Sequence, residues 1–168
     1  MIIWLNGAYG CGKSAVALEL NKLISNSFIY NPENAGNFIR ENLPDAMWKD
    51  DFQDYPLWRE LNYQMIHQLA AECQTIIVPM TIIKPASFEE IIARLAGAAI
   101  EVRHFMLQAS EGTLRQRLRG RGEKPGSWCE GQISRCIAAF QNDIPGTIID
   151  TENKSAFHVA KEIRRATQ

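Results

Sequence analysis

A glycine-rich segment near the N-terminus constrains this chain more than any other feature. Residues 7–14 read Gly-Ala-Tyr-Gly-Cys-Gly-Lys-Ser, which fits the pattern G-x-x-x-x-G-K-[S/T], and they directly follow the apolar run 2–5. Glycines let the backbone turn tightly with several N–H groups pointing inward, and a following helix adds the positive end of its dipole. Apolar residues then recur at helical spacing from Val16 to Ile24. The segment is therefore predicted to bind a polyphosphate mainly through the main chain.

Each residue of this loop has an expected role. The predicted nucleotide site comprises Gly7, Ala8, Tyr9, Gly10, Cys11, Gly12, Lys13 and Ser14. Lys13 is expected to reach the β- and γ-phosphates, and the Ser14 hydroxyl to ligate magnesium, so the expected cofactors are ATP and Mg²⁺. The alternative is an ordinary glycine turn between a strand and a helix.

Length and composition limit the class of protein. With 168 residues and 46% hydrophobic content, the chain is expected to form one domain, residues 1–168, with a substantial core. The formal net charge of −1 favours neither nucleic acid nor an anionic membrane as a bulk partner. No apolar run approaches the ~20 residues of a transmembrane helix, so a cytoplasmic protein is expected. The cysteines and histidines suggest neither a zinc site nor a disulfide framework.

Strand-like runs rich in Ile, Val and Phe alternate with helical patterns. Strands are expected over residues 2–6, 27–30, 75–80, 101–107 and 147–149. Helices are expected over residues 13–25, 33–42, 57–72, 87–96, 111–119, 132–141 and 156–165. This alternation predicts βαβ units, and the nearly continuous apolar strands predict helices on both faces of the sheet. The expected fold is a three-layer α/β P-loop NTPase fold with a five-stranded parallel sheet, kinase-like with a lid.

Two irregular regions, 43–56 and 119–131, interrupt the pattern. In open α/β sheets, ligands lie beyond the carboxyl ends of the strands, so insertions after strands are where substrate and lid elements belong. We expect an acceptor-site insertion at about residues 31–74 and a lid at about residues 117–131.

An unusual run of alternating arginines leads into the lid region, namely Arg115, Arg117, Arg119 and Arg121. Arg117 and Arg121 are four residues apart and share one helix face, while Leu114 and Leu118 are expected to pack inward. Guanidinium groups on a closing loop can stabilise the charge that develops during phosphoryl transfer, and the neighbouring glycines can act as hinges. Arg117 and Arg121 are therefore candidate catalytic residues. The alternative is a solvated arginine face.

The third strand lacks the acidic residue that many P-loop enzymes place at its end, because residues 76–81 read Ile-Ile-Val-Pro-Met-Thr. A carboxylate must come from elsewhere. Glu33, just after the second strand, is a candidate general base or water-mediated magnesium ligand, or else a helix N-terminal glutamate favoured by the dipole. A second acidic group comprises Asp50, Asp51 and Asp54, which could equally be exposed loop acids.

Aromatic residues are densest between positions 48 and 63, close to two arginines. Such a mixture can stack on a planar base or cover an apolar tail while charged groups bind sugars or phosphates. The candidate acceptor-binding residues are Arg40, Asp51, Phe52, Trp58 and Arg59. The alternative for at least half of the rings is a place in the core.

Several sequence blocks together resemble the ATP-binding tunicamycin-resistance proteins of bacteria. They are residues 2–8, 50–58, 77–82, 104–105, 109–110, 113–114, 117–119, 127–128, 132–133 and 135–136. They occur in order over most of the chain, which makes the resemblance more specific than a P-loop alone.

The resemblance implies a nucleoside-monophosphate-kinase-like P-loop fold that binds ATP and protects cells from tunicamycin, a nucleoside antibiotic carrying uracil, sugars and a fatty acyl chain. By position, residues 7–14 would bind the triphosphate, and Arg117 and Arg121 would be lid or adenine-side arginines. The loop 150–153, with Thr151, would border the adenine. Family members carry a basic tail linked to membrane association, whereas this sequence ends at Gln168. Peripheral membrane binding is therefore not carried over.

Three functions remain open from the sequence. One is a kinase that transfers the γ-phosphoryl group of ATP to a hydroxyl of a tunicamycin-like nucleoside or other sugar-containing compound. The second is an ATP-dependent protein that sequesters the drug without chemistry, and the third is a housekeeping metabolite kinase. The expected partner is thus a small molecule and not nucleic acid. The oligomeric state and the identity of the base do not follow from the motifs.

Overall fold

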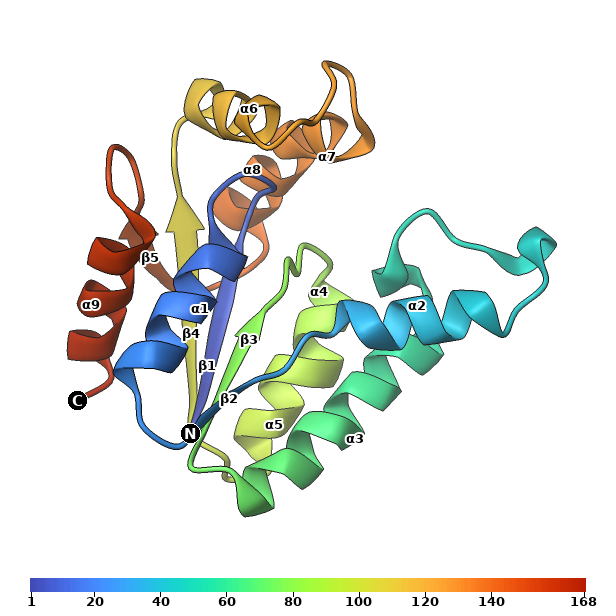
Figure 1. The fold of residues 1–168 in the computed structure, drawn as a ribbon. Helices are drawn as coiled ribbons and strands as arrows, with labels where there is room; N and C mark the ends of the chain where they lie inside the picture. The colour runs from blue at the N-terminus through green and yellow to red at the C-terminus, as the bar shows by residue number, and fades with distance from the viewer.

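A parallel five-stranded sheet forms the centre of the molecule in a computed structural model that describes residues 1–168 (Figure 1). The strand order is β2-β3-β1-β4-β5. The strands are β1 (Ile2–Gly7), β2 (Ser27–Ile29), β3 (Thr75–Pro79), β4 (Val102–Gln108) and β5 (Thr147–Asp150). All four neighbouring pairs are parallel, as the alternating sequence pattern predicts.

The central strand β1 lies between β3 and β4 in the sheet, and the helices packed on the two faces of the sheet bury its side chains. Ile2 is in register with Ile76 of β3 and with Val102 of β4. Side chains of a strand point alternately to its two faces, so β1 contributes to two separate cores. Ile3 belongs to one hydrophobic cluster and Trp4 to the other, and both are fully buried. A continuous apolar run is the expected sequence of such a strand.

Helices cover both faces of the sheet. Figure 1 shows α1 (Lys13–Leu23) beside α9 (Ala156–Ala166) on one face, and α3 (Pro56–Glu72) beside α5 (Arg94–Gly97) on the other. Each pair supplies apolar side chains to the cluster on its own face. The three-layer arrangement is therefore confirmed.

The remaining helices extend these layers or lie beyond the carboxyl ends of the strands. They are α2 (Glu33–Glu41), α4 (Pro85–Ser87), the π-helical turn η3 (Phe88–Ala93), α6 (Glu111–Gly120), α7 (Trp128–Gly131) and α8 (Ile133–Asn142). The expected helix over residues 87–96 is thus part of a continuous segment running from α4 through η3 to α5.

Short helices occupy parts of the two regions that the sequence pattern leaves irregular. They are η1 (Asp45–Met47), η2 (Phe52–Asp54) and α7. Side-chain caps explain two of them, because Asp51 accepts a hydrogen bond from the Gln53 N–H and Ser127 accepts one from the Glu130 N–H. Helical turns of three or four residues are too short to show an apolar periodicity, so the sequence pattern does not predict them. None of the helices combines the length and apolar character that crossing a bilayer requires.

Candidate functional site

The loop between β1 and α1 is held by glycines that no other residue could replace. Gly10 has φ +89°, and a Cβ at this position would lie 2.5 Å from the carbonyl oxygen of Leu114. Gly7, at φ +145°, would place a Cβ 2.5 Å from the Leu107 oxygen. Positive φ angles and close backbone approach both require glycine. The loop is therefore packed directly against β4 and α6.

Lys13 lies across this loop. Its Nζ donates hydrogen bonds to the carbonyl oxygens of Gly7 (2.8 Å) and Ala8 (3.2 Å), and it lies 5.4 Å from the ring centroid of Tyr9. The loop, the ammonium group and the N-terminus of α1 thus converge on one point. This is the arrangement that binds a polyphosphate through main-chain N–H groups and one flexible cation.

Two buried polar side chains attach the segment after β3 to the phosphate loop, and the sequence analysis missed both. Asn6, fully buried, accepts from the N–H of Gly7 (2.8 Å) and of Ile82 (2.9 Å) and donates to the Ile82 oxygen (2.9 Å). Thr81 donates to the Gly7 oxygen (2.9 Å). An asparagine at the end of an otherwise apolar strand is the available signal, because a buried amide requires partners.

A cleft of about 750 Å³ opens beside the phosphate loop. It brings together residues that the sequence predicts for nucleotide binding and for catalysis, namely Tyr9, Gly10, Gly12, Lys13, Ser14 and Arg117 for the first and Glu33 and Arg121 for the second. Ala8 and Cys11 are instead buried, at 3% and 1% exposure, and belong to the core beneath the loop. We call this space the phosphate cleft.

The arginine run of α6 divides into two pairs with different surroundings. Arg117 donates to the Thr151 hydroxyl (3.0 Å) and carbonyl (2.6 Å), so it joins α6 to the loop after β5. Arg121, at the C-terminal end of α6, lines the phosphate cleft. Leu114 and Leu118 are each 1% exposed, so the expected inward face of α6 is confirmed.

The other two arginines of the run surround a buried carboxylate instead. Arg115 and Arg119 each approach Glu130 of α7 at 3.1 Å, and the Gly126 N–H donates to the same side chain at 2.5 Å. The Gly126 N–H, followed by Arg115, lowers the pKa of Glu130. Arg115 and Arg119 therefore fasten α7 to α6 and do not face the cleft.

A second cleft, of about 450 Å³, adjoins the first one, and Trp128 and Cys129 of α7 form part of its wall. Both clefts are lined by Tyr9, Glu33, Met80 and Cys129. The second cleft also brings together Arg40, Asp51 and Phe52, which the sequence predicts for acceptor binding. We call it the acceptor cleft. Burial raises the pKa of the Tyr9 hydroxyl, whose ring lies between the two clefts, above its ordinary value.

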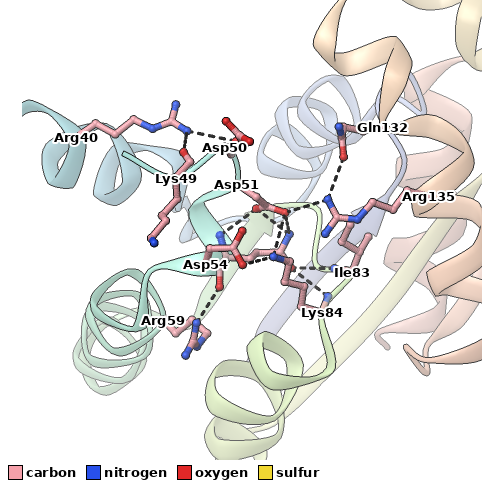
Figure 2. A network of polar contacts seen from close by, with 11 residues as sticks. Arg40, Lys49, Asp50, Asp51, Asp54, Arg59, Ile83, Lys84, Gln132 and Arg135 are labelled. Carbon is pink, nitrogen blue, oxygen red and sulfur yellow. Dashed lines mark hydrogen bonds and ion pairs between the residues drawn. The ribbon is translucent and has the colours of Figure 1, made fainter. Parts of the chain in front are cut away.

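Asp51 lies at the centre of a polar network that spans three segments (Figure 2). It accepts from the backbone N–H of Gln53 at 2.9 Å and lies 4.0 Å from Lys84 Nζ and 3.7 Å from an Arg135 nitrogen. Gln53, only 4% exposed, accepts from the N–H of Ile83 (3.0 Å) and of Lys84 (3.2 Å). Residues 51–53 are thereby connected both to the segment after β3 and to α8. Sequence reasoning missed Gln53.

Two of the expected acceptor residues lie outside both clefts. Trp58 is fully buried, and its Nε1 donates to the Pro32 oxygen at 3.0 Å. Arg59 donates to the Gln53 oxygen at 2.8 Å and pairs with Glu90 at 2.7 Å. Trp58 is thus a core residue and Arg59 connects α3 to η3, which corrects the expectation that they contact an acceptor. The aromatic density of this region does not distinguish its core rings from its exposed ones.

The comparisons with known proteins fit this arrangement. A family model described as an AAA domain matches residues 2–142. The chain belongs to this AAA domain family. A search of curated proteins gave no significant match.

Solved structures extend the likeness of this AAA domain protein to the whole chain. The tunicamycin resistance protein of Deinococcus radiodurans superposes with a TM-score of 0.80 at 26% identity, covering 99% of this chain and 94% of the other. The resemblance noted in the sequence is therefore confirmed. A sugar kinase from Janibacter sp. HTCC2649 (TM-score 0.67, 16% identity, coverage 98% and 92%) shows the same fold. So does the shikimate kinase of Acinetobacter baumannii (TM-score 0.64, 15% identity, coverage 99% and 92%).

Proposed function

We propose that the protein is an ATP-dependent phosphotransferase that acts on a hydroxyl of a small molecule, a tunicamycin-like nucleoside or sugar compound, and so confers resistance to tunicamycin. The observation that carries this proposal is the continuity of the two clefts. They share Glu33 and Tyr9, so a triphosphate in one cleft and a hydroxyl acceptor in the other would meet beside a carboxylate. A site that only binds nucleotide has no need of the second space.

On the nucleotide side, the loop glycines and the N-terminus of α1 would hold the phosphates. Lys13 would leave its two carbonyl partners and pair with the β- and γ-phosphates. Mg²⁺, bound with the nucleotide, supplies charge neutralisation, and the Ser14 hydroxyl is its protein ligand in this proposal. The pair of Arg117 and Thr151 would border the adenine.

The two segments that border the clefts have separate roles in this proposal. Residues 31–74 form an acceptor-site insertion, and residues 117–131 form a lid that brings Arg121 toward the γ-phosphate. The connection between α6 and α7 has glycines at φ +91° (Gly122) and +76° (Gly126), which supply hinges. In this proposal both segments belong to one kinase-like domain, residues 1–168.

The chemical step is a direct transfer. The acceptor oxygen attacks the γ-phosphorus, an O–P bond forms, and the bond from phosphorus to the β,γ-bridging oxygen breaks to release ADP. The hydroxyl proton passes to a carboxylate within about 2.6–3.2 Å or through one water. Glu33 is the proposed general base because it is the carboxylate that lines both clefts. Its position at the start of α2 places it near the cleft but leaves it exposed.

Mass spectrometry of tunicamycin incubated with the protein, ATP and Mg²⁺ tests the proposal. We expect a gain of one phosphoryl group that Glu33→Gln largely removes, by roughly 100-fold in rate, while ATP binding persists. Glu41→Gln, at the other end of α2 and outside both clefts, is the matched control. An unmodified drug would contradict the phosphotransferase. Full activity in Glu33→Gln would retain the kinase but assign the base to Asp51.

A second candidate is ATP-dependent sequestration of the drug. It is favoured by the segment after β3, where Met80 and Thr81 stand in place of an acidic residue, and by the exposure of Glu33. Tight binding of unmodified tunicamycin that requires ATP would establish sequestration instead of transfer.

A further inference from the structure

Carboxylates outnumber cations on the walls of the acceptor cleft. Glu33, Asp50 and Asp51 line it, against only two cations, Arg40 and Lys49. A phosphorylated acceptor carries close to two negative charges at neutral pH. Enclosing such a group beside three carboxylates is unfavourable unless free cations compensate for them.

Of the two cations that line this cleft, Arg40 already has partners, and so do the nearby Lys84 and Arg135 (Figure 2). Arg40 donates through Nη2 to the carbonyl oxygens of Lys49 (2.5 Å) and Asp50 (3.3 Å), and its guanidinium lies 4.4 Å from the Phe52 ring centroid. Lys84 forms an ion pair with Asp54, and both Lys84 and Arg135 approach Asp51. Lys49 Nζ alone makes no hydrogen bond or ion pair. One free lysine is a weak receptor for a phosphate, which is normally bound by several donors.

Two half-exposed tryptophans line the same cleft. Trp48 is 51% exposed and Trp128 is 48% exposed, whereas Trp4 and Trp58 are fully buried. Both exposed rings are nevertheless held in place. Trp48 Nε1 donates to the carbonyl oxygens of Arg40 (3.1 Å) and Leu43 (3.2 Å). Trp128 packs edge-to-face on Tyr9, with the ring centroids 5.3 Å apart and the ring planes at 77°. Fixed aromatic surfaces inside a polar cleft suit stacking on a flat ring.

We propose that the acceptor cleft selects an uncharged compound with a flat ring, a nucleoside or a glycosylated nucleoside, and rejects the corresponding phosphate monoester. The volume of about 450 Å³ is in the range of small-molecule sites. This inference rests on the proposed function for the identity of the cleft and adds the specificity that the cleft imposes. The walls supply stacking surfaces and hydrogen-bond acceptors for hydroxyl groups, and they oppose a second anion next to the triphosphate.

Calorimetric titration of the full chain tests the selectivity. The phosphate cleft is first saturated with Mg²⁺ and a non-hydrolysable ATP analogue, and uridine, UMP and tunicamycin are then titrated separately. We expect the two uncharged compounds to bind and UMP to bind at least about tenfold more weakly than uridine. Equal or tighter binding of UMP would overturn the inference. Binding of none of the three compounds would also overturn it.

A pair of charge variants locates the cause. The Asp50 carboxylate makes no hydrogen bond or ion pair and lines the cleft, so Asp50→Lys should raise the affinity for UMP relative to uridine by about tenfold. Asp45→Lys, in η1 of the same insertion but outside the cleft, changes the net charge equally and should leave this ratio unchanged. Equal shifts in both variants would show that net charge alone discriminates, which would refute the role of the cleft.

A third variant tests the aromatic wall. Trp128→Leu should weaken uridine and UMP alike, by about tenfold, because it removes a stacking surface and no charge. Unchanged affinity for uridine would contradict the stacking part of the inference.

Measurement of turnover keeps this inference separate from the proposed function. If uridine or tunicamycin binds selectively but is never phosphorylated, the phosphotransferase fails and the selectivity of the cleft stands. If UMP is phosphorylated more efficiently than uridine, the phosphotransferase stands and the selectivity fails.

Discussion

The phosphate loop and the acceptor cleft are adjacent, yet they are built in opposite ways. The phosphate loop is made of consecutive residues, and Lys13 bonds to carbonyls only five and six positions away. The acceptor cleft is made of segments far apart in the chain, which include α2, the loop before η2, Met80 and α7. Gln53 and Ile83, which are joined by a hydrogen bond, lie 30 positions apart. The conformation of the first site therefore comes mainly from consecutive backbone, which packs as a unit on β4 and α6, whereas the second site exists only through contacts between distant segments.

This difference predicts that a substitution at one site should change binding at that site and leave binding at the other site unchanged. Variants of the loop should change nucleotide binding without disturbing the acceptor side. Variants of the network around Asp51 should do the reverse. The following four experiments test this separation in order of decreasing expected effect.

Lys13→Ala should weaken binding of ATP with Mg²⁺ by about 100-fold, because it removes the cation that pairs with two phosphates. The main-chain loop remains, so the melting temperature should not fall. Lys22→Ala, on the exposed face of the same helix, is the control. Calorimetry measures the affinity. Unchanged affinity for ATP in Lys13→Ala would contradict the proposal that the phosphate cleft binds the triphosphate.

Gln53→Leu should lower the free energy of unfolding by about 2–3 kcal/mol, because the buried N–H groups of Ile83 and Lys84 lose their acceptor. Affinity for the acceptor should fall as well, while affinity for ATP should stay within about twofold of wild type. Urea denaturation and calorimetry measure the two effects. Gln64→Leu, exposed on α3, is the control. A parallel loss of ATP affinity would show that the two sites are not separable.

Arg117 and Arg121 should differ, although they share a helix face in the sequence pattern. Arg117→Ala should weaken ATP binding by about tenfold, because the Arg117 side chain is bonded to Thr151 at the nucleotide side. Arg121→Ala should instead lower kcat by about tenfold or more with little change in ATP affinity, as expected for a group that meets charge in the transition state. Steady-state kinetics together with calorimetry separate the two effects. Equal changes of kcat and of ATP affinity in the two variants would mean that both arginines have the same role in the lid.

Gly36→Ala should have the smallest effect and only on the acceptor side. A Cβ at Gly36 would lie 2.5 Å from the Phe52 ring, which must then move. We expect a loss of about 1 kcal/mol in stability and a several-fold loss of acceptor affinity. Gly112→Ala, where a Cβ has no neighbour within 4 Å, should be neutral or stabilise α6 by up to about 1 kcal/mol. Wild-type acceptor binding in Gly36→Ala would show that the Phe52 ring does not shape the cleft.

Periodicity and motif predicted the fold to within a residue or two at most element ends. The five strands, their parallel pairing and helices on both faces follow from patterns that repeat along the chain. The sequence also predicted which face of α6 points inward, because Leu114 and Leu118 follow helical spacing. It did not predict η1, η2 or α7, which are too short to leave a periodic signal, and of which only η2 and α7 have a side-chain cap.

The sequence predicted best those parts of the candidate site whose residues act through neighbours close in the chain. Gly7 to Ser14 could be assigned from the motif because each residue acts through its own backbone or its immediate neighbours. Trp58 was wrongly grouped with the acceptor residues because an aromatic side chain has the same appearance in a sequence whether it is buried or exposed. Gln53 and Asn6 were missed because the partners of a buried amide lie 30 and 76 positions away.

The sequence by itself determined the phosphate loop, the alternation of strands and helices and the apolar faces that form the two cores. These features arise from interactions between near neighbours or from simple repeats. Only the tertiary structure decided that Arg115 and Arg119 pair with Glu130, that Glu33 lines both clefts and which aromatic rings remain exposed. Those outcomes depend on where α6 and α7, which lie beyond the carboxyl ends of the strands (Figure 1), sit relative to residues 31–54. The physical reason is that a side chain finds its charge partner or its burial through contacts that are distant in sequence, and such contacts form only when the layers pack.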